Sequence, residues 1–325
     1  MGIQTQLDTY PSLEAPSWRH RHLLDMDDFV REEVEVVFNT ADAMREVLRR
    51  DIKRVPTLRG KSIVLLFYEP STRTRVSFEM AAKNLSADAI NLTSTTSSVT
   101  KGESLVDTIR TIRALGADAV VIRHPQSGAP YLATHHLDAS VINAGDGCHA
   151  HPTQALLDLY TVQHQLGKLD GLKITIIGDI VHSRVARSDI QGFGLMGADV
   201  VLCGPPTLMP PGWEQNPPRG VTIDTNVNHA VKDADVVMAL RLQKERQQEG
   251  LLPGTEEYAQ LYQLTEHRLS LAKPEALVMH PGPVNEGVEI TPEVAQGTQS
   301  LIEEQVTNGL AVRMALLYLI VGGKN

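Results

Sequence analysis

Short apolar runs, rich in β-branched residues, alternate with longer amphipathic segments along almost the whole chain. Four such runs in the first half are predicted strands, at 61–69, 88–93, 118–125 and 139–145. Five more follow in the second half, at 172–179, 198–205, 221–225, 234–242 and 276–283. Strands that are apolar throughout, rather than at alternate positions, are typical of parallel sheets covered by helices on both faces. The alternation therefore predicts two parallel sheets, one in each half of the chain.

Helices are expected between these strands, at 72–85, 104–115, 130–136, 183–196, 226–232 and 256–272, with an opening helix at 27–49. This order indicates an α/β protein with two doubly wound, Rossmann-like domains. Two further long helices frame the second series. One starts at Pro152 and stops at Gly167, as helix-end preferences require, and the other closes the chain. We expect domains at 1–151 and 152–303, joined by these two helices, with the helix at about 304–325 packing back on the first domain.

Composition narrows the class of partner. The chain has 325 residues, 42% of them hydrophobic, and a formal net charge of −9, which disfavours nucleic-acid binding. Its two cysteines, Cys148 and Cys203, form neither a disulfide framework nor a zinc set. The N-terminal stretch lacks the apolar core of a secretory signal, and the apolar run "MALLYLIVGG" is too short to span a bilayer. We expect a cytoplasmic protein that binds neither nucleic acid nor membrane.

The stretch "FYEPSTRTRVSFE" ends the first predicted strand. Pro70 stops the strand, and Ser71 to Thr74 can begin a helix whose first N–H groups bind an anion. Hydroxyls add donors, and a guanidinium matches phosphate with two hydrogen bonds. The alternative is an ordinary helix cap beside surface arginines. Three hydroxyls interleaved with two arginines favour a phosphate site, and without a Walker A pattern a small phosphorylated substrate is expected.

Other polar loops follow the later strands of the first half. "STTSSVTKGES" carries Lys101, and is either a solvated loop or a lid that closes on an anion. Arg123 ends a strand, and "AGDGCHAHPTQ" brings His149, His151 and Gln154. No carboxylate or thiolate set completes a metal site around the two histidines, so we predict no metal. His151 is either a buried structural histidine or a neutral donor to a carbonyl oxygen.

The second series of strands has polar ends as well. "GDIVHSRVARS" has one glycine after its strand, which falls short of a dinucleotide fingerprint, so we predict no cofactor. Arg184 begins the next helix, and "ALRLQKER" presents Arg241 and Gln243 after another strand. A charged helix face is the alternative for that group. Because ligands of open α/β sheets bind beyond the carboxyl ends of the strands, these loops are where a site is expected.

Taken together, these stretches resemble the carbamoyltransferase family along essentially the whole chain. "STRTR" with "HPTQ" is typical of the family as a class, whereas "TKGES", "LQKER" and "HPGP" resemble the catalytic chains of its aspartate-specific members. An ornithine-specific member would be expected to show H-C-L-P at 280–283. The resemblance implies transfer of a carbamoyl group from carbamoyl phosphate to L-aspartate, the first committed step of pyrimidine synthesis. A carbamoyltransferase for another amine, such as ornithine, is the alternative.

The resemblance also implies roles for individual residues. Those that match the carbamoyl phosphate site are Ser71, Thr72, Arg73, Thr74, Ser97, Lys101, Arg123, His151, Gln154, Gly282 and Pro283. Those that match the aspartate site are Lys101, Arg184, Arg241 and Gln243. Of these, Arg73, Thr74, Lys101, Arg123 and His151 are the expected catalytic residues.

The resemblance further implies a homotrimer with shared active sites, in which Ser97 and Lys101 reach a neighbouring subunit. Regulatory or dihydroorotase chains in a larger assembly are further possible partners. One departure is visible after "HPGP", where many bacterial relatives carry Asn-Arg-Gly and this chain reads Asn285, Glu286, Gly287. No essential cation is therefore expected at 286.

Overall fold

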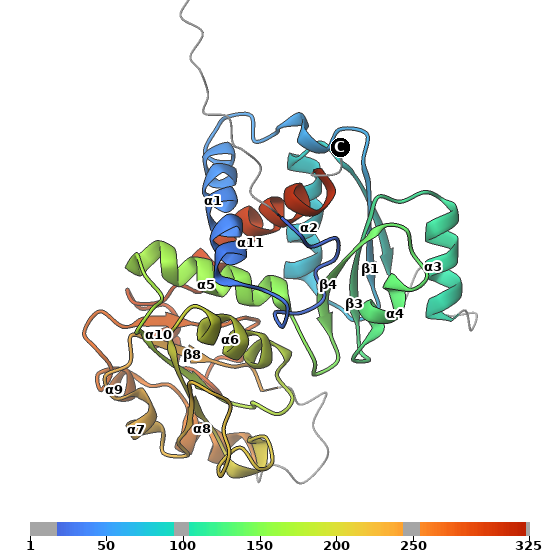
Figure 1. The fold of residues 1–325 in the computed structure, drawn as a ribbon. Coiled ribbons are helices and arrows are strands. Elements are labelled where there is room, and N and C mark those ends of the chain that lie inside the picture. Colours follow the sequence, from blue (N-terminus) through green and yellow to red (C-terminus); the bar gives the residue numbers. More distant parts are fainter. Residues whose placement is uncertain (1–17, 94–103, 243–253, 323–325) are drawn as a thin grey trace, which may run out of the picture.

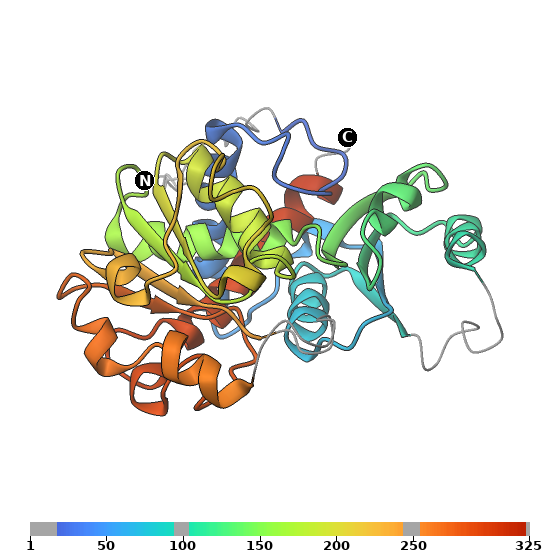
Figure 2. The same cartoon turned by 90° about the horizontal axis from the view of Figure 1, so that it is seen from below.

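The structure is a computed structural model that describes residues 18–93, 104–242 and 254–322. Its centre is two parallel sheets, which lie in different halves of the molecule (Figures 1 and 2). The first has the order β2-β1-β3-β4, and the second β7-β6-β5-β8-β9. The strands are β1 Ser62–Phe67, β2 Asp88–Thr93, β3 Ala119–His124, β4 Ser140–Asp146, β5 Lys173–Ile177, β6 Asp199–Cys203, β7 Val221–Ile223, β8 Val236–Ala239 and β9 Leu277–Met279.

Both sheets are doubly wound. In the first, β2 lies on one side of β1 and β3 on the other, so the winding reverses between β1 and β3. In the second, the reversal falls between β5 and β8. Each of these two switch points leaves a crevice beyond the carboxyl ends of its strands. The predicted fold class is confirmed, and each observed strand falls within a predicted one except β4, which runs one residue further, to Asp146.

Helices cover the sheets as expected, with one correction. The first sheet carries α1 Arg31–Leu48, α2 Thr72–Asn84, α3 Leu105–Ala114 and α4 Ala129–Thr134, and the second α6 Arg184–Leu195, α7 Val227–Val231, α8 Thr255–Tyr262, α9 Glu266–Leu269 and α10 Pro292–Ala295. The single helix predicted at 256–272 is wrong. The chain turns extended at Gln263, Leu264 pairs with Ile290, and Thr265 caps a new helix. Helix α10 was not predicted, nor were the 3-10 turns at Pro56–Leu58 and Pro206–Leu208.

Two long helices connect the halves. Helix α5, Pro152–Leu166, has His151 at its N-cap and ends at Gly167, whose φ of 74° suits glycine. Helix α11, Ile302–Leu317, continues as a π turn over Tyr318–Gly322 and packs against α1, α2 and α5. The last helix therefore returns to the first sheet's half, as Figure 1 shows in red. The exact domain limits, 1–151 and 152–303, remain a prediction.

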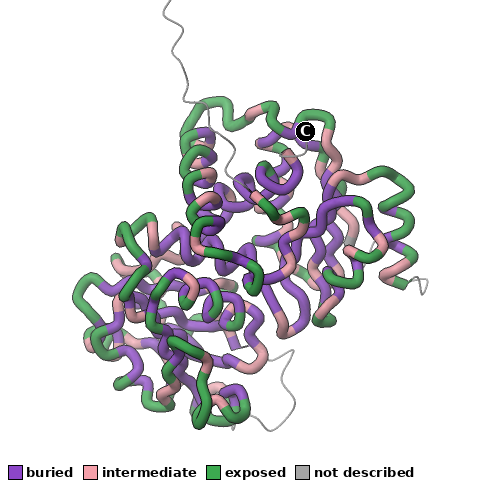
Figure 3. Tube along the Cα trace, in the orientation of Figure 1, coloured by how far each residue is buried: buried purple, intermediate pink, exposed green. Residues whose placement is uncertain are grey.

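Burial identifies α11 as a core helix. By length and composition Ile302–Gly322 is apolar enough to cross a membrane, and among the described residues no other helix meets that criterion. However, 72% of that apolar stretch is buried inside the protein. Met314, Ala315 and Leu316 are fully buried, in one cluster with residues of α1 and α5. Figure 3 shows the same burial along both sheets and the two connecting helices.

Candidate active site

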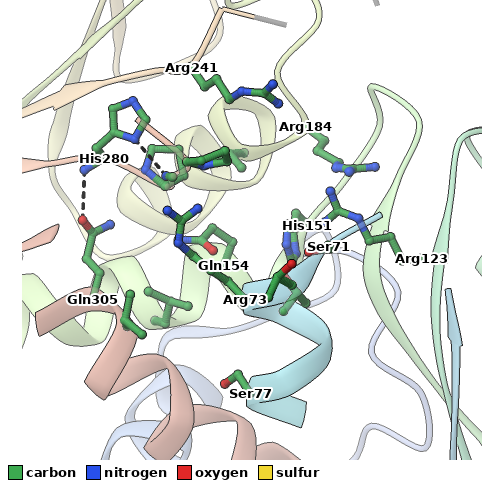
Figure 4. A pocket seen from close by; sticks show the side chains of 18 of the residues that line it. Ser71, Arg73, Ser77, Arg123, His151, Gln154, Arg184, Arg241, His280 and Gln305 are labelled. Atoms are coloured by element: carbon green, nitrogen blue, oxygen red, sulfur yellow. Dashed lines mark hydrogen bonds between the residues drawn. The ribbon is translucent and has the colours of Figure 1, made fainter. Parts of the chain in front are cut away.

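A cavity of about 890 Å³ lies between the two sheets (Figure 4). Its walls include the segments that follow β1, β5, β8 and β9, namely 69–74, 183–185, 240–241 and 280–283. Side chains from α5 and α11 complete the lining. The switch points of both sheets therefore open into the same cavity, as expected for a site beyond the carboxyl ends of parallel strands.

Most of the residues singled out in the sequence meet here. The cavity is lined by Ser71, Thr72, Arg73, Thr74, Arg123, His151, Gln154, Arg184, Arg241, Gly282 and Pro283. Ser97, Lys101 and Gln243 lie outside the described residues. Sequence reasoning missed several other residues that line the cavity, namely Glu69, Ser77, Ser183, Gln305 and Arg313.

The N-terminus of α2 points its unpaired N–H groups at the cavity. Ser71 is the N-cap, with an extended backbone, and within the described residues its side chain makes no capping hydrogen bond. The first turn contains no acidic residue. Ser71 and Thr72 line the cavity at the positive end of the helix dipole, where an anion would be stabilised.

Arg73 projects from this first turn against the loop after β9. A Cβ added at Gly282 would lie 2.6 Å from Nη1 of Arg73, and the φ of Gly282 is +65°, so a side chain here would be strained and would displace the guanidinium. Burial and the nearby charge of Arg241 lower the pKa of Arg73. No carboxylate of the described residues forms an ion pair with it or is among the groups that shift its pKa. A partly buried guanidinium in this setting favours an anionic ligand.

Elsewhere in the cavity, two arginines do have a carboxylate partner, the side chain of Glu69. Its Oε2 lies 3.4 Å from Nε of Arg123 and 2.7 Å from Nη2 of Arg184. Arg184 is only 3% exposed, and its Nη1 also donates to the backbone oxygen of Gly147 at 3.3 Å. In Figure 4 the guanidinium groups of Arg123 and Arg184 extend toward each other. A carboxylate from the β1 loop thus connects one arginine of each half, a role that nothing in the spacing of "FYEPSTRTR" indicated.

His151 and Gln154 enter the cavity from the start of α5. The backbone N–H of His151 donates to Oγ of Ser188 at 2.9 Å, which fixes the position of the N-cap. Nε2 of Gln154 donates to Oδ1 of Asp158 at 3.0 Å, one turn further along. His149 lies apart from the cavity lining, with its Nδ1 3.1 Å from Asp146. In the described ranges no group of three or more His, Cys, Asp or Glu side chains is placed to hold a metal ion.

The "HPGP" loop is held by hydrogen bonds that define the histidine tautomer. The N–H of Gly282 donates to Nδ1 of His280 at 2.8 Å, so the imidazole proton is on Nε2, which donates to Glu289 at 3.1 Å. The backbone N–H of His280 donates to Oε1 of Gln305 at 2.9 Å. The peptide bond before Pro283 is cis. Glu286 is exposed and is not among the residues that line the cavity.

Comparisons with known proteins identify the family. Residues 21–164 match the family model described as "Aspartate/ornithine carbamoyltransferase, carbamoyl-P binding domain". Residues 170–320 match the corresponding "Asp/Orn binding domain". The chain belongs to the aspartate/ornithine carbamoyltransferase family.

Curated members of this family are similar over nearly their whole length. The aspartate carbamoyltransferase catalytic subunit of Dehalococcoides mccartyi strain CBDB1 is 58% identical over 324 residues, covering 99% of this chain and 98% of the relative. That of Roseiflexus sp. strain RS-1 is 60% identical over 306 residues, covering 94% and 96%.

Solved structures of carbamoyltransferases share the fold. An aspartate transcarbamoylase from Trypanosoma cruzi, in complex with carbamoyl phosphate and aspartate, matches with a TM-score of 0.85 at 28% identity, covering 94% of this chain and 98% of that one. The ornithine carbamoyltransferase of Pyrococcus furiosus matches with a TM-score of 0.83 at 29% identity and the same coverage. The two acceptor specificities thus occur on one fold.

Proposed function

We propose that this chain transfers the carbamoyl group of carbamoyl phosphate to the amine of L-aspartate, giving N-carbamoyl-L-aspartate and phosphate. This reaction is the first committed step of pyrimidine synthesis. One observation supports it above all. The cavity joins an anion site at the N-terminus of α2 to a second set of arginines from the other sheet. Relatives 58–60% identical over nearly the full chain are aspartate carbamoyltransferase catalytic subunits.

Carbamoyl phosphate occupies the wall formed by the first half of the chain. The phosphate binds the start of α2 through Ser71, Thr72 and Arg73, while Gly282 and Pro283 close that side. Thr74, Arg123 and His151 surround the carbonyl oxygen, and Gln154 contacts the carbamoyl amino group. All of these residues line the cavity, which supports the assignment.

L-aspartate occupies the wall formed by the second half. Arg184 and Arg241 bind its carboxylates, because a guanidinium matches a carboxylate with two hydrogen bonds. Gln243 follows Arg241 by two positions and adds a contact to the same substrate. Lys101 contacts both substrates.

The reaction needs no nucleophile from the protein. The neutral amine of aspartate attacks the carbonyl carbon, a C–N bond forms, and charge develops on the carbonyl oxygen. Thr74, Arg123 and His151 donate to that oxygen. The C–O bond to phosphate then breaks, and the phosphate accepts the amine proton as it leaves, stabilised by Arg73 and Lys101. Orientation and electrostatics supply most of the rate.

Ornithine as the acceptor is the second candidate, because a structural relative at 29% identity is an ornithine enzyme. The arginines of the second wall disfavour it, since they would repel the side-chain ammonium of ornithine. The test is a steady-state assay of the full chain with carbamoyl phosphate and either amine. Carbamoyl-aspartate formation is expected. Citrulline formation instead would establish the second candidate, and neither product would refute both.

The protein is proposed to be a cytoplasmic homotrimer in which Ser97 and Lys101 complete the site of a neighbouring subunit. Strand β2 is an edge strand and is followed directly by residue 94. Large hydrophobic side chains are exposed on and beside it, namely Ile90 on β2 and Val76 and Met80 on α2. These exposed apolar side chains lie at the edge of the sheet from which the loop with Ser97 and Lys101 continues. They support contact between this edge and a second copy of the chain. Regulatory or dihydroorotase chains would bind elsewhere on the trimer.

Subunit mixing tests the shared site. Arg73→Ala chains and Lys101→Ala chains should each be nearly inactive. In a cyclic trimer the contacts are heterologous, so a site can combine Arg73 of one chain with Lys101 of the next. After random equal mixing, about one quarter of all sites should recover. No recovery, with mixed trimers confirmed by native mass spectrometry, would place Lys101 in its own subunit's site.

A further inference from the structure

A buried carboxylate lies directly beneath the cavity. Asp158, one turn after Gln154 on α5, is fully buried and does not line the cavity. Its Oδ1 accepts from Nε2 of Gln154 at 3.0 Å and from Nε2 of Gln305 at 2.7 Å. Oδ2 also lies 3.2 Å from Nε2 of Gln154. Asp158 therefore holds the amide groups of two residues that line the cavity.

These contacts define which end of the Gln154 amide faces the substrate. A carboxamide has a donor end, Nε2, and an acceptor end, Oε1. Because Nε2 is directed at Asp158, the acceptor Oε1 is the end presented to the cavity. An amino group is a donor, whereas a methyl group of the same size is not. A fixed acceptor at this position therefore distinguishes a carbamoyl group from an acetyl group.

The same carboxylate fixes the opposite side of the cavity through Gln305. Since Asp158 accepts from Nε2 of Gln305, the acceptor end of that amide meets the backbone N–H of His280 at 2.9 Å. His280 in turn accepts from Gly282, the residue packed against Arg73. The chain of hydrogen bonds joins α5, α11 and the loop after β9, and Figure 4 shows its last two links as dashed lines.

The charge around Asp158 is consistent with an acceptor role. Burial raises the pKa of Asp158 to about 7, while the amides of Gln305 and Gln154 and the charge of Arg313 oppose that rise. If Asp158 is protonated on Oδ2, its Oδ1 can still accept from the amides of Gln154 and Gln305. Asp189 is fully buried nearby, and among the described residues neither of its oxygens has a hydrogen-bond partner. Burial and the charge of Asp158 raise the pKa of Asp189 well above its usual range.

We propose that Asp158 is a positioning residue that orients the amide of Gln154 and thereby makes the site select a carbamoyl group over an acetyl group. The inference rests on the proposed function, because it assumes that Gln154 contacts the transferred group. Asp158 itself touches no substrate and acts through Gln154.

The test compares two stable phosphonates that differ only in that group. Phosphonoacetamide carries an amino group where acetonylphosphonate carries a methyl group. Calorimetry on the wild-type full chain at pH 8 should show phosphonoacetamide binding at least about tenfold more tightly, the value of one hydrogen bond to a fixed acceptor. In Asp158→Leu, of similar shape but without an acceptor, the ratio of the two dissociation constants should fall toward about one.

Matched variants separate orientation from structure. Asp158→Asn keeps one acceptor oxygen and should restore most of the ratio. Asp189→Leu removes an equally buried carboxyl that contacts neither glutamine, and should leave the ratio at the wild-type value. If Asp158→Leu does not fold by circular dichroism, Asp158→Ala replaces it, because alanine fits any helix interior and also lacks the acceptor.

The outcomes are distinct. A wild type that binds neither phosphonate would refute the proposed function itself. A wild type that discriminates, with Asp158→Leu or Asp158→Ala keeping the ratio or weakening both ligands equally, would overturn the role of Asp158 alone.

Discussion

Arg73 and Arg184, which line the cavity from different halves of the chain, differ in whether the protein supplies a carboxylate partner. Arg73, at the start of α2, has no carboxylate partner among the described residues, and it packs on the glycine of the "HPGP" loop. Arg184, from the other sheet, already contacts Glu69 at 2.7 Å. The charge of Arg73 is therefore left for a ligand to neutralise, whereas Glu69 also lies 3.4 Å from Arg123, the other arginine of the phosphate wall. The acceptor wall is partly neutralised by the protein, which leaves its charge adjustable by Glu69.

The largest effect is expected from Arg73→Ala. A charged donor that acts mainly in the transition state contributes about 3 kcal/mol or more, so turnover should fall at least about a hundredfold. Steady-state kinetics with a circular dichroism check of folding measures this. Arg75→Ala, two residues along the same helix and outside the cavity lining, is the control and should stay near wild type. Unchanged turnover in folded Arg73→Ala would remove the phosphate assignment.

The packing of Arg73 can be tested without changing its charge. In Gly282→Ala the new Cβ would displace the guanidinium, and misplacing a binding group by about 1 Å costs up to about a hundredfold in rate. Gly287→Ala is a matched control, because Gly287 has a similar φ of +79° but open space around its Cα. Gly287→Ala should lose about 1–2 kcal/mol of stability, the cost of the left-handed backbone for alanine. Equal kinetic losses in both variants would show that backbone strain, rather than Arg73, is responsible.

The acceptor wall should respond differently to a lost arginine. Arg241→Ala should raise the apparent KM for aspartate by about ten- to a hundredfold, the value of one charged hydrogen-bonded contact. Binding of phosphonoacetamide should be nearly kept, because that ligand fills only the phosphate wall. Arg219→Ala, exposed in the same half, serves as the control. Loss of phosphonoacetamide binding in Arg241→Ala would contradict the separation of the two walls.

The smallest effect is expected from Glu69→Gln, which keeps the shape of the side chain but removes its charge. Arg184 then loses the charged contact that orients it, and the KM for aspartate should rise about fivefold, which corresponds to about 1 kcal/mol, the net value of one typical hydrogen bond. Glu79→Gln, which breaks a pair with Lys83 on the outer side of α2, should have no such effect. A lower KM for aspartate would contradict this role. It would mean that Glu69 competes with the substrate for Arg184 and does not orient Arg184 toward the substrate.

Some strands and site residues could be predicted from the sequence because local patterns mark them, whereas others depend on contacts between distant segments. Most of the strands in the described part of the chain are buried on both faces, and continuous apolar runs therefore marked their positions, whereas the edge strands β2 and β7 are partly exposed. Residues such as Arg73, Arg184 and Arg241 were found because they lie in the loop or at the helix start that comes after a strand. Glu69 was missed, since its partners are 54 and 115 positions away and nothing in its own neighbourhood marks them. Gln305 was missed because it lies on a helix that reads as apolar core, and only packing brings α11 beside α5.

The path of α11 sets a condition on how the chain can fold during synthesis. Its side chains complete a core shared with α1 and α2, yet among the described elements it follows every strand of both sheets in the sequence. While α11 is still within the ribosome, the N-terminal half therefore lacks one of its own walls and exposes apolar side chains such as Val37 and Phe78. A nascent chain would complete its N-terminal core only after α11 had emerged from the ribosome, by which time the second sheet had already been synthesised.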